Sequence, residues 1–137
     1  MIKLFFETDH RVLMAQVSGI CSSQDIVELD QAVIHFLAQH ERAQDAPIRA
    51  IYDFSRVDAL AIPESRIVER RHHPAIVHGK RVLVVRNARE SGHARAFAEE
   101  QKIAGYDEPA IVGSFGEACA LLRLDHPRFD PIEQPVG

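Results

Sequence analysis

The segment Glu69-Arg70-Arg71-His72-His73, followed by His78, contains several side chains that commonly bind metal ions. On a helix, Glu69 lies one turn from both His72 and His73, so one carboxylate and one imidazole could share a metal. Adjacent histidines point about 100° apart, however, and the neighbouring arginines oppose a cation. The segment therefore favours a solvated helix face, or a surface for an anion or a partner, and we expect no bound metal.

Asp53 ends a strand predicted over residues 48–54, at the edge where open α/β sheets place ligands. A phosphoacceptor aspartate of the receiver type would also need an acidic pair after the first strand and a lysine after a late one. The comparable strand ends, Val17-Ser18-Gly19 and Ile111-Val112-Gly113-Ser114, supply neither. We therefore expect Asp53 to cap backbone donors in the loop that follows.

A second candidate site is the segment Arg86-Asn87-Ala88-Arg89-Glu90-Ser91-Gly92-His93, which joins a predicted strand to a helix N-terminus. Free amide donors, the helix dipole, Arg89 and His93 could together hold a phosphate or carboxylate. A plain capped helix start explains the same residues, and the segment lacks the glycines of a phosphate-binding loop.

Nucleophilic catalysis has little support. Cys119 falls in an apolar helix, and Cys21 precedes a helix, where the pKa of a thiol can be lowered, but no base is identifiable beside it. No Gly-x-Ser-x-Gly elbow is present. We assign no catalytic residue and no cofactor, and we lean against an enzyme.

Composition limits the class of protein further. The chain has 137 residues, a formal charge of −4 and 46% hydrophobic residues, which are the values of one globular domain. The charge gives no bias towards nucleic acid, and no apolar run approaches the roughly 18 residues of a membrane span. The two cysteines show no framework spacing and the N-terminus no signal peptide, so we expect a cytoplasmic protein.

Hydrophobic periodicity predicts an α/β fold. Strands are expected over residues 2–6, 11–18, 48–54, 81–86 and 109–112, and helices over about 23–44, 64–73, 91–104 and from 115 onwards. This order predicts a mixed sheet of about five strands with four helices: an opening antiparallel hairpin, then parallel crossovers. We place the domain at residues 1–124 and a proline-containing tail at 125–137.

The element order and the segment Ile51-Tyr52-Asp53-Phe54-Ser55-Arg56-Val57 resemble the STAS domains, the group of SpoIIAA-like proteins, over residues 2–124. In the antagonists of this group, the segment leads to an Asp-Ser-Ser-Gly loop whose serine is phosphorylated by a partner kinase. Here the matching residues are Ala61-Ile62-Pro63-Glu64, and Ser65 is out of register. The chain is thus more similar to a branch without that serine, related in shape to Sec14-type lipid-binding domains.

This resemblance implies a non-enzymatic regulatory or binding module. The ligand would be a partner protein or an apolar, acidic small molecule, including a lipid. The alternative is a small enzyme at the same sheet edge. We expect that the chain does not bind nucleic acid and is not an integral membrane protein. A homodimer is compatible with this interpretation, and the oligomeric state stays open.

The site is expected where parallel strands end. Three loops should meet there: Ser55 to Pro63, Asn87 to His93, and Gly113 to Gly116. The candidate ligand-binding residues at this edge are Asp53, Ser55, Arg89 and His93.

Overall fold

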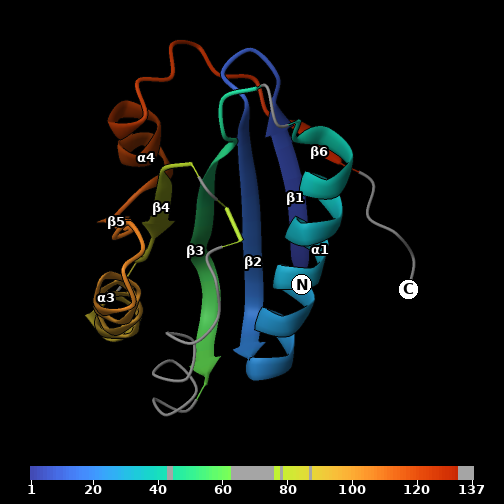
Figure 1. Ribbon diagram of the computed structural model, residues 1–137. Helices are drawn as coiled ribbons and strands as arrows, with labels where there is room; N and C mark the ends of the chain where they lie inside the picture. The colour runs from blue at the N-terminus through green and yellow to red at the C-terminus, as the bar shows by residue number, and fades with distance from the viewer. Residues whose placement is uncertain (43–44, 63–75, 78, 87, 133–137) are drawn as a thin grey trace.

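The computed structural model describes residues 1–42, 45–62, 76–77, 79–86 and 88–132. Its elements are β1 (Ile2–Glu7), β2 (Val12–Ser22), α1 (Ser23–His40), β3 (Arg49–Ala61), β4 (Arg81–Val84), α3 (Ala88–Ile103), β5 (Ala110–Val112), α4 (Phe115–Leu121) and β6 (Asp130–Ile132). The strands form a mixed sheet in the order β5-β4-β3-β2-β1-β6 (Figure 1). Strands β2 to β5 are mutually parallel, and β1 is antiparallel to both of its neighbours.

The sheet is covered on both faces. Leu29, Val33, Phe36 and Leu37 of α1 pack on one face, and α3 packs on the same face through Ala94 and Phe97. Tyr52 of β3 contacts both of these clusters. Ala118 and Leu122 pack on the opposite face, against Val82 and Val84 of β4. Because β4 is buried on both faces, its run of apolar residues is unbroken and does not alternate with polar ones.

Helix α1 begins where the sequence predicted it. The hydroxyl of Ser22 accepts the Asp25 N–H (3.2 Å), and the Asp25 carboxylate accepts the Ser22 N–H (2.7 Å), which completes a capping box. The helix ends at His40 rather than near residue 44. Among the described residues 38–42 no apolar side chain is buried, so continuing the helix through them would add nothing to the core.

Strand β3 is longer than predicted. Residues 55–61, expected as a ligand-binding loop, continue the strand and pair in parallel with Ser18–Ser22, an extension of β2. Gly19, expected to end β2, instead lies at a register shift with φ of +78°, a conformation that glycine adopts without strain. The predicted loop is therefore wrong over residues 55–61, where Val57 and Leu60 pack into the core below α1.

The predicted strand number is also wrong. Residues 130–132, inside the expected tail, form a sixth strand that pairs with Leu4–Phe6 of β1. Its Pro131 is tolerated because β6 lies at the edge of the sheet within the described chain. The division between a domain ending at residue 124 and a tail stays a prediction.

The remaining differences concern the helices. Helix α3 starts at Ala88, three residues before the predicted start, and the described part of the chain contains three helices. The fourth expected helix, over residues 64–73, lies outside the described residues. No helix in the described ranges is long and apolar enough to span a membrane.

Candidate functional site

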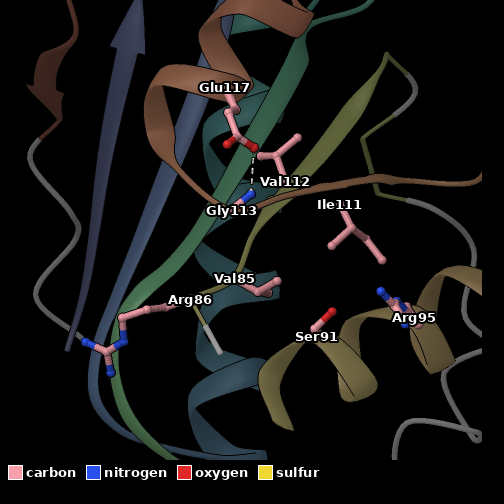
Figure 2. A pocket seen from close by; sticks show the side chains of 8 residues that line it. All are labelled: Val85, Arg86, Ser91, Arg95, Ile111, Val112, Gly113 and Glu117. Carbon is pink, nitrogen blue, oxygen red and sulfur yellow. Dashed lines mark hydrogen bonds between the residues drawn. The ribbon is translucent and has the colours of Figure 1, made fainter. Parts of the chain in front are cut away.

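A shallow, open depression of about 380 Å³ lies at the carboxyl ends of β4 and β5, where α3 and α4 begin. Two of the three loops expected at this edge contribute to it, and Figure 2 shows its lining side chains. The lining consists of Val85, Arg86, Ser91, Arg95, Ile111, Val112, Gly113 and Glu117. We call this feature the carboxyl-end depression.

The apolar part of the depression comes from the strand ends. Val85 follows β4, and its N–H donates to the carbonyl of Val112 (3.0 Å), which continues the β4–β5 pairing beyond the last strand residue. Ile111 and Val112 belong to β5 and are half-buried. These three side chains form the apolar part of the lining.

The polar side of the depression belongs to α3. Ser91 and Arg95 are four residues apart on this helix, so their side chains lie on the same face. Arg95 is exposed and makes no hydrogen bond or ion pair with the described part of the chain. A hydroxyl and a guanidinium therefore border the apolar surface together.

The opposite side of the depression carries a negative charge. The hydroxyl of Ser114, the N-cap of α4, accepts the Glu117 N–H (3.1 Å). The carboxylate of Glu117 accepts the N–H of Gly113 (3.0 Å), the residue before the N-cap, and not the N–H of Ser114 that a capping box would use. A ligand carboxylate is thus repelled from the α4 side and attracted to the α3 side.

Arg86 contributes to the lining but is directed away from Ser91 and Arg95 (Figure 2). Its guanidinium donates to the carbonyl of Val57 in β3 (2.9 Å). This bond fastens the end of β4 to the extended half of β3. Arg86 therefore stabilises the border between β3 and the depression.

The predicted site residues fall into two groups. Asp53 and Ser55 lie within β3 and do not belong to the lining. Asp53 is 4% exposed, and its carboxylate accepts the Ser55 N–H (2.9 Å) at a register shift in the β2–β3 pairing. This confirms that Asp53 caps a nearby backbone donor, although the donor lies inside a strand and not in a loop.

The other two predicted residues lie on α3. Arg89 is in its first turn, and its side chain is outside the described set; His93 is half-buried in the second turn. The helix that carries them does border the depression, so their ligand-binding role stays a prediction. Sequence reasoning missed Ser91 and Arg95 as a pair, although their i, i+4 spacing on a predicted helix was a usable signal.

The cysteines are not activated thiols. Burial, together with the charge of Asp25, raises the pKa of Cys21 to about 11, and burial also raises the pKa of Cys119. The expectation that a helix start could lower the pKa of Cys21 is wrong, because this thiol is completely buried below α1.

The possible metal ligands Glu69, His72, His73 and His78 lie outside the described residues. Within the residues that are described, no group of three or more His, Cys, Asp or Glu side chains could hold a metal ion. Of the segment matching the phosphorylation loop, Ala61 ends β3, whereas Pro63, Glu64 and Ser65 also fall outside the description.

Solved structures of low sequence identity share this fold. One is an uncharacterised protein of the DUF3478 family, with a SpoIIAA-like fold, from Shewanella loihica PV-4. It is 12% identical to this chain, the match covers 89% of this chain and 92% of that chain, and the TM-score is 0.56. Another is the anti-sigma factor antagonist SpoIIAA in its unphosphorylated form. It is 13% identical, the match covers 91% of this chain and 100% of that chain, and the TM-score is 0.53. The chain therefore has a SpoIIAA-like, STAS-type fold, as the resemblance implied. No family model and no curated protein matches the sequence.

Proposed function

We propose that this chain is a binding module that holds a molecule with an apolar body and an acidic head in the carboxyl-end depression. The observation that carries this proposal is the Ser91–Arg95 pair on α3. It places a hydroxyl, and a guanidinium without a partner among the described residues, beside the apolar ends of β4 and β5. The proposal is supported by the fold, which this chain shares with the anti-sigma factor antagonist SpoIIAA, a regulatory protein.

The arrangement of charge determines the orientation of the ligand. A carboxylate or phosphate next to Arg95 forms a charge-assisted hydrogen bond, which is stronger than a neutral one. Glu117, on the α4 side, repels the same group. The acidic head therefore lies against α3, and the apolar body lies over Val85 and Ile111.

The size of the depression favours a small molecule over a folded partner. Its volume of about 380 Å³ is at the lower end of the roughly 300–1,000 Å³ of small-molecule sites. An enzyme is the less favoured alternative, because the lining contains few groups that could catalyse a reaction. It provides one hydroxyl, Ser91, and one carboxylate, Glu117, which already accepts the Gly113 N–H.

The test uses octanoate and octanol, which share an apolar chain and differ in the head group. Titration followed by amide resonances should show octanoate shifting Ser91, Arg95, Ile111 and Gly113, with octanol binding more weakly. Arg95→Gln should weaken octanoate binding by roughly 10- to 100-fold, the loss of a hydrogen bond to a charged group, and leave octanol binding unchanged.

Lys102→Gln provides the matched control. Lys102 lies on the same helix, near its opposite end, and is 72% exposed, so its removal should not affect octanoate. Equal octanoate affinities for Arg95→Gln and the unmodified protein would rule out this site. A response confined to an added acidic, apolar peptide would instead identify a protein partner.

A further inference from the structure

The outward face of α1 carries two large aliphatic side chains, Val27 (45% exposed) and Ile34 (52% exposed). The helix already buries Leu29, Val33, Phe36 and Leu37 against the sheet, so these two residues do not serve the core. β-branched residues also lower helix propensity at such positions. One exposed aliphatic residue needs no explanation, but two on the same side of one helix form a potential contact surface.

Helical geometry places these residues relative to their neighbours. Val27 and Ile34 are seven residues apart, so at about 100° per residue they project within roughly 20° of each other. Glu28 and His35 have the same spacing and form a second row, with Gln31 between the two rows. All five side chains are exposed. The face therefore has an aliphatic row and a row of one carboxylate and one imidazole.

We propose that a second copy of this chain docks on this face, with the two α1 helices antiparallel and a two-fold axis beside Gln31. That axis keeps each row against the same row of the other copy. Val27 then lies against Ile34 of the second copy, and Glu28 lies against His35 of the second copy, each contact occurring twice. The two contacts are centred midway between residues 27 and 34 and between 28 and 35, both within one residue of Gln31.

The charge pattern selects this arrangement over a parallel one. In the antiparallel pair, each Glu28 carboxylate meets an imidazole that can donate a hydrogen bond to it. A parallel pair would place the aliphatic row of one copy against the polar row of the other. The face thus matches itself in one orientation, as an interface between identical subunits requires.

The size of the face sets the strength of the contact. An 18-residue helix is about 27 Å long, so two such helices bury less than the roughly 1,200 Å² at which stable complexes begin. Association is therefore weak and depends on protein concentration.

Sedimentation equilibrium over micromolar to millimolar concentrations tests the interface. The unmodified protein should change from monomer to dimer across this range. Ile34→Glu places four carboxylates at the interface, counting Glu28 of each copy, and should remain monomeric at all concentrations. Ile103→Glu is the matched control, since Ile103 is a 63% exposed isoleucine on α3, and this variant should dimerise like the unmodified protein.

A charge exchange tests the orientation. Glu28→Lys should weaken the dimer by about tenfold, roughly 1.4 kcal/mol, and the double variant Glu28→Lys/His35→Glu should restore it. An unmodified protein that stays monomeric at millimolar concentration would overturn the proposal. So would a dimer that tolerates Ile34→Glu, or a double variant no stronger than Glu28→Lys. None of these outcomes affects the octanoate experiment, which concerns a different surface.

Discussion

Glu7 ends β1 with a carboxylate that is 2% exposed. Its Oε2 accepts hydrogen bonds from the His10 backbone N–H (2.6 Å) and approaches the His10 Nδ1 (2.7 Å), which closes the turn between β1 and β2. Desolvation alone would raise the pKa of Glu7, but the bonds from His10 and from the Asp9 backbone outweigh it. The pKa of Glu7 therefore lies below its ordinary value of 4.5.

This pair predicts a specific loss of stability in acid. Because the folded pKa is below the unfolded one, the carboxylate contributes its full stabilisation above about pH 4.5 and loses it as the pH falls through the folded pKa. Glu7→Gln should cost about 1–3 kcal/mol near neutral pH, and this difference should vanish in strong acid. Thermal unfolding of both proteins across the pH range measures it.

Glu99→Gln, at an exposed position on α3, is the control and should follow the unmodified protein at every pH. A constant difference between Glu7→Gln and the unmodified protein down to strong acid would show that ionisation of Glu7 is not the cause.

Among the elements, those with local determinants were predicted well. Helix α1 was predicted from its periodic apolar residues, a signal that lies within the helix itself. The extension of β3 over residues 55–61 was missed because its partner is Ser18–Ser22, more than thirty residues earlier in the chain. The residue pattern within 55–61 does not indicate which strand these residues pair with. The sheet edge that carries the depression could be predicted from topology. The residues that line it could not, since side-chain directions on α3 depend on where the helix starts.

Replacing two glycines by alanine should have opposite effects on stability, because only one of them lies close to another element. A Cβ added to Gly79, just before β4, would lie 2.5 Å from the Ile48 carbonyl oxygen and 3.1 Å from the Arg49 Cα, both backbone atoms that cannot easily move. Gly79→Ala should therefore lower the melting temperature. A Cβ at Gly92, inside α3, would meet nothing within 4 Å, and Gly92→Ala should stabilise the protein by about 0.5–1 kcal/mol through helix propensity.

Calorimetry of the two alanine variants separates these effects. A melting temperature of Gly79→Ala at or above that of the unmodified protein would show that Gly79 does not lie in close contact with the backbone of Ile48 and Arg49.

At the scale of the whole molecule, the two ends of the described chain are joined through the sheet. β6 pairs with β1, and Ile132 packs with the core below α1. On the other face, Phe129 contacts Phe115 of α4 edge-on, with ring centroids 5.5 Å apart. The proline content of residues 125–137 predicted a tail, but it could not indicate that residues 130–132 of this stretch pair with β1 as a strand.

Truncation tests whether the stretch after residue 124 is dispensable. Removing residues 125–137 deletes both the partly buried Phe129 and β6. It should destabilise the protein by about 2 kcal/mol, near the lower limit for losing a large core side chain. The melting temperature should then fall by roughly 6 °C. A shorter truncation after Ile132 keeps β6 and is the matched control. Equal melting temperatures for the two truncated proteins would support a tail without a structural role.

The β1–β6 pairing also has a consequence in time. Leu4 pairs with Ile132, so the outer edge of β1 obtains its partner only after 128 further residues have been synthesised. At about 5–20 residues per second, this takes roughly 6–26 s on the ribosome. During that interval the nascent chain can form the β1–β2 hairpin while the other edge of β1 stays unpaired, and an unpaired edge can join a strand from another chain. The last residues of the described chain therefore end the period in which a newly made molecule is most prone to aggregate.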